Sequence, residues 1–253
     1  MLGDRVLVAL AEGVLSLTLN RPDKRNALDT AMVSGLLEGL ERADLDPDVR
    51  VVAVFGAGPD FCAGADLAEL LASAGQSPGE NEAHARRLGE VFVRMRRLPK
   101  PVAAVVQGRA LAGGCGLASA CDVVLAHEQA TFGYPEVRRG FVPAMVMAML
   151  YRAVGEKVAF DLVATGRLLG AAEAQAAGLV SRVVPADGFD SLVREVLDGL
   201  AASSGTALAL IKQQLYAIDG RSFEEAIDLG ASTNAVARAT PDFQAAVAKF
   251  LDK

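Results

Sequence analysis

The sequence contains few residues of the kinds that build disulfide frameworks or metal sites. It has only three cysteines in 253 residues, an odd number without a Cys-x-x-Cys spacing, so neither a disulfide framework nor a zinc knuckle is expected. The cysteines are instead expected to be small buried side chains. The only histidines, His84 and His127, have no metal-ligand partner at helical spacing. The sequence therefore predicts no metal site, with both histidines on the surface.

Long apolar runs and an excess of positive charge are also missing. No stretch reaches the roughly 18 apolar residues of a membrane span, and the N-terminus has no charged stretch followed by an apolar core. The net charge of −6 argues against a general nucleic-acid binder, because neutralising phosphates requires basic surface. A hydrophobic fraction of 52% supplies ample core for a globular enzyme, and a cytoplasmic location is expected.

Glycines cluster where an apolar strand gives way to a helix-forming run, in residues 107–122 (QGRALAGGCGLASACD). The first N–H groups of a helix lack internal partners and its dipole is positive there, so such a turn can hold developing negative charge. Glycines in this place also serve close packing alone. A second glycine-rich turn lies in residues 55–67 (FGAGPDFCAGADL). If the N–H groups of Ala65 and Gly113 aim at one carbonyl oxygen, they form an oxyanion hole.

Four segments stand in an order and spacing that carry a family resemblance. They are residues 20–28 (NRPDKRNAL), 61–67 (FCAGADL), 112–122 (AGGC followed by ACD) and 134–140 (YPE followed by G). Together they resemble the successive motifs of the crotonase superfamily, the enoyl-CoA hydratase/isomerase group. The resemblance extends from about residue 5 to the C-terminus.

The resemblance implies an α/β fold built as a spiral of repeated ββα units. Residues 1–186 would form the core with a CoA-thioester site, and residues 187–253 a helical trimerisation region. A homotrimer or a dimer of trimers is expected, with an acyl-CoA substrate, no separate cofactor, and no nucleic-acid or membrane partner. From the sequence pattern alone, the C-terminal helices either pack within one subunit or supply an oligomer interface.

The resemblance also assigns residues to the site. It implies an oxyanion hole from the matching N–H groups of Ala65 and Gly113, and contacts to substrate from the motif positions Ala63, Asp66 and Gly114. The carboxyl of Asp66 fits better as a helix-start cap than as an acid in the reaction.

Glu136 is the predicted catalytic acid and base. It follows a rigid proline and precedes the apolar run 141–150 (FVPAMVMAML). Apolar surroundings would raise the pKa of this carboxyl by desolvation, as a proton shuttle requires. The alternative is an exposed helix-start glutamate next to Arg138 and Arg139.

A second carboxylate is missing from the expected place. The two-carboxylate members of the family have a glutamate three residues after the oxyanion glycine, and that position is Gly116 here. Hydration of a double bond is most readily served by two carboxylates, whereas one suffices to carry a proton between carbons. Glu136 alone therefore favours a Δ3,Δ2-enoyl-CoA isomerase. If only the missing carboxylate limits hydration, Gly116→Glu should raise it.

Three classes of function remain at this point. A hydratase-type enzyme comes first, because the segments around the glycine turn and Glu136 resemble family members classed as hydratases, and the isomerase is its alternative. A CoA-ester binding protein without turnover is the second class. A thioesterase or serine-type peptidase comes last, since no serine has a histidine and an acid in suitable company.

Two pairs of residues are candidates for binding the CoA nucleotide. Lys24 and Arg25 lie in a motif loop that lines the nucleotide end in the family, although a solvated turn explains them equally well. Phe250 and Lys253 match an aromatic-plus-lysine pattern that reaches the nucleotide in the family, often across a subunit boundary.

Strand and helix patterns alternate along the first part of the chain. A hairpin is expected from residues 6–10 and 14–19, and a helix from a cap at Asp29 to about residue 43. A helix over 84–98 and a strand over 102–106 follow. The alternation favours a parallel, crossover-built sheet.

One segment is expected to be irregular. Residues 72–83 (ASAGQSPGENEA) have the composition of turn formers and are predicted to form a mobile loop. This loop either closes over substrate or is plain surface.

Overall fold

The computed structural model describes residues 4–252, and its centre is a six-stranded sheet in the order β1-β2-β3-β4-β6-β9. The predicted hairpin is confirmed, because β1 (Val6–Ala11) pairs antiparallel with β2 (Val14–Leu19). From β2 onward each strand is parallel to its neighbour, which confirms the crossover-built sheet. The remaining strands are β3 (Val51–Gly56), β4 (Val102–Val106), β6 (Val123–His127) and β9 (Arg182–Val184).

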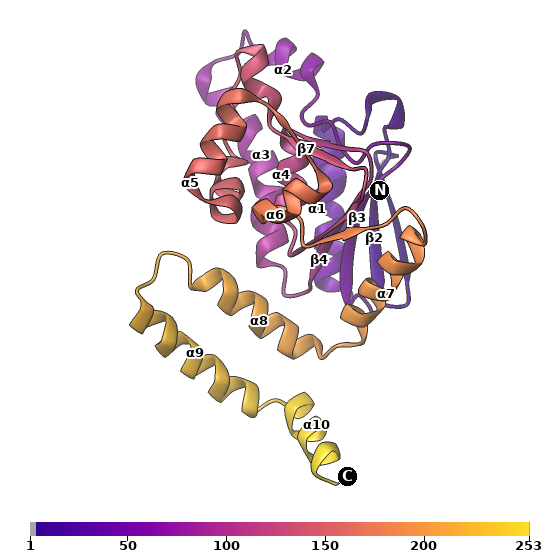
Figure 1. Cartoon of the computed structure of the whole chain (residues 1–253), viewed down its shortest axis with the longest axis vertical. Coiled ribbons are helices and arrows are strands. Elements are labelled where there is room, and N and C mark those ends of the chain that lie inside the picture. The colour runs from indigo at the N-terminus through magenta and orange to yellow at the C-terminus, as the bar shows by residue number, and fades with distance from the viewer. Residues whose placement is uncertain (1–3, 253) are drawn as a thin grey trace.

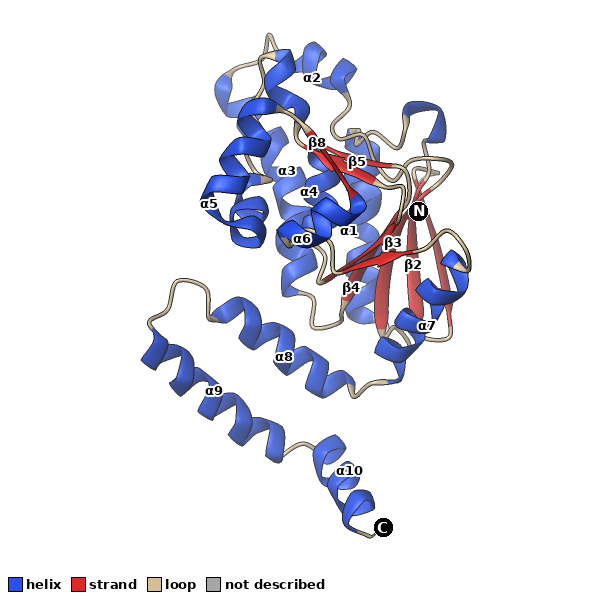
Figure 2. Ribbon diagram, viewed as in Figure 1, coloured by secondary structure: helices blue, strands red, loops and turns tan. Residues whose placement is uncertain are grey.

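Helices cover both faces of this sheet (Figures 1 and 2). The side chains of β3 alternate between two hydrophobic clusters, with Val52 and Val54 in the larger and Val51 and Ala53 in the smaller. The larger cluster also contains residues of α1 (Thr30–Leu45), α3 (Pro78–Arg97) and α4 (Gly113–Ala120), and the smaller contains residues of α7 (Phe189–Ala202). Burial on both faces explains why the strands read as continuous apolar runs.

A second, smaller sheet leads into the glycine-rich turn at residues 112–114. It consists of β5 (Arg109–Leu111), β7 (Thr131–Gly133) and β8 (Leu168–Gly170), in that order. β5 runs parallel to β7 and leads, through one residue, into α4. We did not expect these strands from the sequence, because three residues are too few to show an alternating pattern.

Helix caps decide where α1 and α3 begin. The Asp29 side chain accepts a hydrogen bond from the Met32 N–H, as expected, and α1 ends at Leu45, two residues later than predicted.

The prediction of a mobile loop over 72–83 is wrong. α2 (Leu67–Ser73) occupies its start, and α3 begins at Pro78, where Ser77 and Glu80 form a capping box. This reciprocal pair of hydrogen bonds stabilises the first helical turn and outweighs the turn-former composition.

The C-terminal helices divide into a packed part and a projecting part. After α5 (Met147–Thr165) and α6 (Ala171–Ala177), α7 packs on the sheet, so the boundary predicted at residue 187 falls just before a core helix. On α8 (Gly205–Ala217), the buried Lys212 ammonium lies 2.7 Å from Asp122 Oδ2 and donates to the Met95 carbonyl at 2.7 Å. α9 (Phe223–Arg238) and α10 (Pro241–Leu251) extend away from the body (Figure 1).

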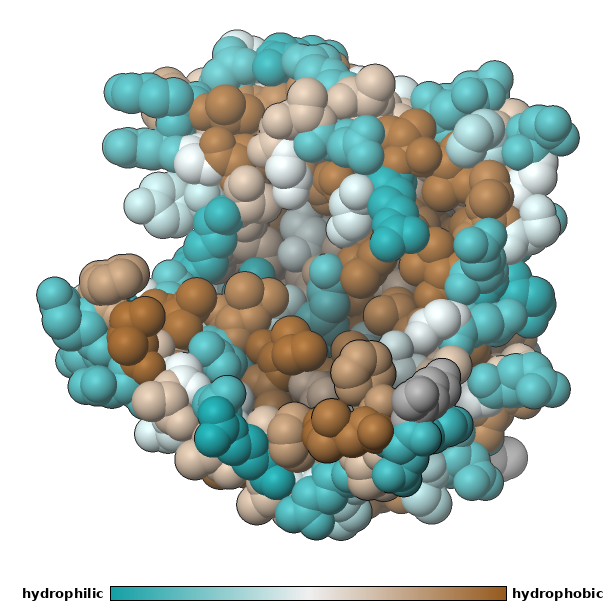
Figure 3. Space-filling view, turned by 60° about the horizontal axis from the view of Figure 1, so that its bottom comes forward, coloured by the Kyte–Doolittle hydropathy of each residue, from teal (hydrophilic) through white to brown (hydrophobic). Residues whose placement is uncertain are grey.

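The projecting helices carry exposed apolar side chains. Figure 3, which turns the end with these helices toward the viewer, shows hydrophobic residues gathered around a hollow. The exposed residues of α9 and α10 include Phe223, Ile227, Val236, Phe243 and Phe250, and α8 adds Ile211 and Leu215. Such a surface suits an oligomer interface, and the trimer stays a prediction. Within residues 4–252, no helix has both the length and the apolar character needed to cross a membrane.

Candidate active site

A strained turn presents the Gly113 amide at the start of α4. Ala112 has φ 53° and ψ −126°, a region that L-residues rarely adopt and that costs about 1–3 kcal/mol. Hydrogen bonds fix this residue on both sides, because its N–H donates to the Gly133 carbonyl at 2.8 Å and its carbonyl accepts from the Gly116 N–H at 3.0 Å. Within residues 4–252, the N–H of Gly113 has no hydrogen-bond acceptor. The turn thus leaves one helix-start donor free.

The second glycine-rich turn leaves a matching donor. The Leu28 N–H donates to the Gly64 carbonyl at 2.8 Å, and the Asp66 N–H donates to the Leu28 carbonyl at 3.0 Å. This parallel bridge uses the groups on either side of Ala65, and no acceptor in the described part of the chain takes the Ala65 N–H. Gly64 has φ +97°, and a Cβ there would lie 2.7 Å from the Ala112 Cβ. Glycine is therefore required for the two turns to touch.

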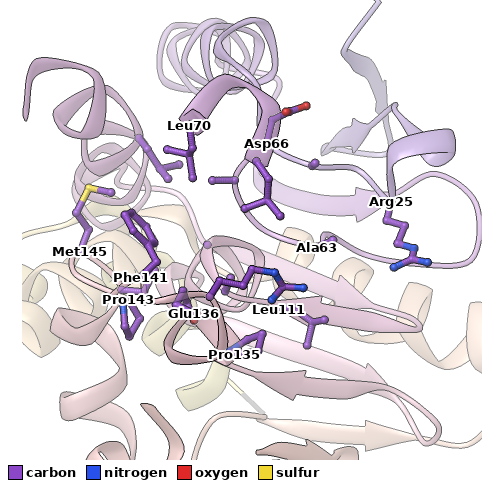
Figure 4. A pocket seen from close by; sticks show the side chains of 18 of the residues that line it. Arg25, Ala63, Asp66, Leu70, Leu111, Pro135, Glu136, Phe141, Pro143 and Met145 are labelled. Atoms are coloured by element: carbon purple, nitrogen blue, oxygen red, sulfur yellow. The ribbon is translucent and has the colours of Figure 1, made fainter. Parts of the chain in front are cut away.

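The two turns and Glu136 line one cavity of about 550 Å³ (Figure 4). A Cβ built on Gly113 would lie 3.6 Å from the Ala65 nitrogen, so the two free amides are close together. Opposite them, the short 3-10 helix η2 (Pro135–Arg139) carries Glu136. The structure thus brings together the three residues that the sequence analysis assigned to catalysis.

Glu136 is buried, and its carboxyl lacks a full set of partners. The residue is only 9% exposed, and its Oε2 atom has no hydrogen-bond partner in the described structure. Desolvation raises the pKa of the Glu136 carboxyl, and the nearby Arg139 opposes this only in part. The alternative of an exposed helix-start glutamate is therefore wrong. A buried carboxyl with a raised pKa and a free oxygen suits proton transfer.

We expect Glu136→Gln to stabilise the folded protein at neutral pH. Burial raises the folded-state pKa of Glu136. The contribution of this group to the free energy of unfolding is therefore complete below its unfolded-state pKa and is lost as the pH rises through its folded-state pKa. Glutamine carries no charge at any of these pH values, so the variant loses no stability in this way as the pH rises. The stability difference should therefore grow as the pH rises above about 4, near the unfolded-state pKa of glutamate, as denaturant unfolding at several pH values would measure. A difference independent of pH would contradict this explanation.

Apolar side chains form the wall beyond Glu136. Figure 4 shows Phe141, Pro143 and Met145 on one side of Glu136, and Arg25 with Ala63 on the other. The apolar part fits an acyl chain. The apolar run 141–150 predicted part of this wall. Leu70 of α2 and Leu88 of α3 also line the cavity, but no sequence pattern indicated that they would. They reach the cavity only through the packing of those two helices.

The residues expected to bind substrate do not all reach the cavity. Lys24, Arg25, Ala63 and Asp66 line it, and the two basic side chains are exposed there and form no ion pair within residues 4–252. Gly114 does not line the cavity. It packs against Cys62, since a Cβ on Gly114 would lie 2.3 Å from the carbonyl oxygen of Cys62.

The remaining predicted substrate-binding residues lie near the C-terminus. Phe250 is 77% exposed on the projecting α10 and does not line the cavity of its own chain. Lys253 lies outside the described residues. The carboxylate of Asp66, although at the cavity, caps α2 and pairs with Arg21, which agrees with its expected role as a cap.

The cysteines and histidines do not form a competing catalytic site. All three cysteines are buried, as expected, and burial raises the pKa of the Cys115 thiol to about 11, which disfavours a thiolate nucleophile. His84 is exposed on α3. His127 is only half-buried at the end of β6, where its ring packs edge-on against Phe189 at 5.1 Å, so its expected surface position is only partly correct.

Val146 occupies the space beside the position of the missing carboxylate. A Cβ built on the buried Gly116 would lie 2.1 Å from Val146 Cγ1 and 2.9 Å from Val146 Cβ. Val146 also lines the cavity and is 4% exposed. No side chain larger than hydrogen fits at residue 116 while Val146 keeps its place. The expectation that Gly116→Glu by itself would raise hydration is therefore not supported by the packing.

Comparisons with known proteins agree with the geometry. The family described as enoyl-CoA hydratase/isomerase matches residues 9–253. The chain is 43% identical over 235 residues to a Thermus thermophilus protein whose name assigns it to the enoyl-CoA hydratases, covering 93% of each chain. It is 36% identical to the 2,3-dehydroadipyl-CoA hydratase of Escherichia coli, covering 98% of this chain and 96% of that protein.

A solved structure shows the same architecture. The crystal structure of an enoyl-CoA hydratase from Mycobacterium smegmatis superimposes with a TM-score of 0.93 at 33% identity. The match covers 98% of this chain and 96% of that one.

Proposed function

Because this chain belongs to the enoyl-CoA hydratase/isomerase family, we propose that it is a hydratase-type enzyme acting on an enoyl-CoA thioester. One observation carries the proposal. A buried Glu136 with an unpartnered oxygen shares a cavity with the free N–H groups of Ala65 and Gly113. The names of the similar proteins support hydration as the reaction.

The two amides would act on the thioester oxygen. When water adds to C3 of a 2-enoyl thioester, the electron pair of the double bond moves toward the carbonyl and places negative charge on that oxygen. The N–H groups of Ala65 and Gly113 stabilise this enolate, and one such donor is worth about a hundredfold to a thousandfold in rate. Lys24 and Arg25, exposed at the cavity, would attract the phosphates of CoA.

Glu136 would handle the proton. As a base it takes a proton from the attacking water while the oxygen of that water bonds to C3. As an acid it then returns the proton to C2, and the enolate electron pair forms the new C–H bond. Desolvation raises the pKa of Glu136 above the ordinary value for glutamate, which makes it a better proton acceptor for the first half of the reaction.

The packing of Val146 against Gly116 favours a second candidate, a Δ3,Δ2-enoyl-CoA isomerase. With no carboxylate at residue 116, and with Asp66 engaged by Arg21 and the start of α2, Glu136 would remove a proton from C2 of a 3-enoyl thioester. The electron pair would spread onto the thioester oxygen held by the two amides. Return of the proton to C4 then completes the shift of the double bond without water.

Product analysis with two substrates tests both candidates. We expect the purified protein to convert a 2-enoyl-CoA to the 3-hydroxyacyl-CoA, as loss of the ultraviolet absorbance of the conjugated thioester would show. Conversion of a 3-enoyl-CoA to the 2-enoyl-CoA without 3-hydroxy product would select the isomerase. No conversion of either thioester, despite binding, would instead select a CoA-ester binding protein.

A further inference from the structure

Arg21 joins the first turns of two helices through one buried cation. Its Nη1 atom lies 2.8 Å from Asp66 Oδ2 and 3.1 Å from Asp29 Oδ2, and it donates to the Ala27 carbonyl at 3.1 Å. The Arg21 side chain is 10% exposed, so these ion pairs are shielded from solvent. Loss of Arg21 is strongly unfavourable for Asp66, whose 13% exposed carboxylate would lose its cation, whereas Asp29 would keep Arg5 at 3.0 Å.

Each carboxylate of this cluster also caps a helix. Asp29 Oδ1 accepts from the Met32 N–H at 2.7 Å at the start of α1, and Asp66 Oδ1 accepts from the Ala68 N–H at 2.9 Å at the start of α2. The pairing with Arg21 holds the pKa of the Asp66 carboxyl below its usual range. Arg21 thus ties the start of α2 to the start of α1.

Apolar burial contributes little to holding α2. The helix has no buried residue, and Leu67 and Leu71 are 58% and 78% exposed. A second link between the two helix starts is exposed to solvent. In it, Thr30 donates from its N–H and its hydroxyl to Glu69 Oε2 at 2.9 and 3.0 Å. The Arg21–Asp66 pair is the shielded side-chain part of this attachment, and it adds to the two backbone hydrogen bonds that Leu28 makes with Gly64 and Asp66.

We propose that Arg21 is a positioning residue for the Ala65 amide. Ala65 directly precedes Asp66 and lines the cavity, so a displacement of Asp66 moves the Ala65 donor. The same displacement moves the wall residues on α2. Arg21 also lines part of the cavity, but its Nη1 atom is held by Asp29, Asp66 and the Ala27 carbonyl, so we assign its action to the Ala65 amide. The proposal rests on the oxyanion role of Ala65 in the proposed function.

The test compares Arg21→Met and Arg21→Lys with a matched control, Lys212→Met. The control removes a buried pair in which Lys212 Nζ lies 2.7 Å from Asp122 Oδ2, with the two side chains 7% and 15% exposed. Lys212 lies on α8 and does not line the cavity. We measure kcat and KM with an enoyl-CoA, and hydrogen exchange of the amides in residues 62–73.

Arg21→Met is expected to lower kcat by about tenfold to hundredfold, with a much smaller change in KM, because a small misplacement of a donor acts on the transition state. Exchange in residues 62–73 should become faster. Arg21→Lys, which keeps a cation, should give intermediate values in both measurements and serves as the test if Arg21→Met does not fold. Lys212→Met should keep kcat near that of the wild type.

Three results would overturn the proposal. They are wild-type kcat in folded Arg21 variants, unchanged exchange in residues 62–73, and an equal loss of kcat in Lys212→Met. Failure of the proposed function is recognised separately. Full activity of Glu136→Gln would refute that function, while the exchange of residues 62–73 would still report whether Arg21 anchors this segment.

Discussion

Glu136→Gln is expected to abolish turnover of enoyl-CoA thioesters while leaving the binding of the CoA ester nearly unchanged. Glutamine matches the carboxyl in size but neither accepts nor returns a proton, and general acid–base catalysis contributes about a hundredfold to ten-thousandfold in rate. The substitution leaves the amides of Ala65 and Gly113 in place, so ground-state contacts to the thioester persist. Steady-state kinetics and isothermal titration calorimetry with a saturated acyl-CoA measure the two quantities.

A matched control separates chemistry from a general loss of charge. Glu156→Gln removes a carboxylate from the exposed surface of α5, away from the cavity, and should retain wild-type kcat. Turnover that survives Glu136→Gln would remove Glu136 from the mechanism. Loss of binding together with turnover would assign it to substrate binding.

Gly116→Glu is expected to destabilise the protein and to add no hydration activity. Its Cβ would lie 2.1 Å from Val146 Cγ1, and the remaining atoms of the side chain need further space. Overpacking of a core costs about 1–3 kcal/mol for extra methylenes, and burial of an unpaired carboxylate adds to this, so we expect a loss of about 3 kcal/mol or more. Denaturant unfolding and the hydration assay measure the two effects.

A double substitution tests Val146 as the cause. Val146→Gly removes the atoms that lie within 3 Å of the added Cβ, so Gly116→Glu with Val146→Gly should be less unstable than the sum of the two single changes. The unfolding free energies of all four proteins give this coupling. A Gly116→Glu protein with wild-type stability and increased hydration would show that Val146 is no barrier.

Much of the architecture follows from local sequence patterns. Apolar runs such as 51–55 predict buried strands, Asp29 predicts a helix start, and their alternation predicts a parallel sheet, all as observed. These features depend on residues close together in the chain, whose periodicity and hydrogen bonding act within a few residues. The fold expected from the family resemblance, an α/β core with a helical C-terminal region, is confirmed by the structural matches.

Some elements escaped prediction for identifiable reasons. The three-residue strand β5 is stabilised by pairing with β7, about twenty residues further along, and has no pattern of its own. The segment 72–83 is largely helical, because the Ser77–Glu80 capping box acts more strongly than the turn-forming composition. The small site elements therefore depend on pairings or caps that composition does not show.

The sequence by itself identified three residues that line the cavity, because the motifs around Ala65, Gly113 and Glu136 each lie within a short stretch of chain. Only the tertiary structure decided their properties. The free oxygen of Glu136, the obstruction of Gly116 by Val146, and the link from Arg21 to Asp66 each depend on residues far apart in the chain. Burial and the pKa shift it causes exist only after packing removes water, so no local pattern contains them.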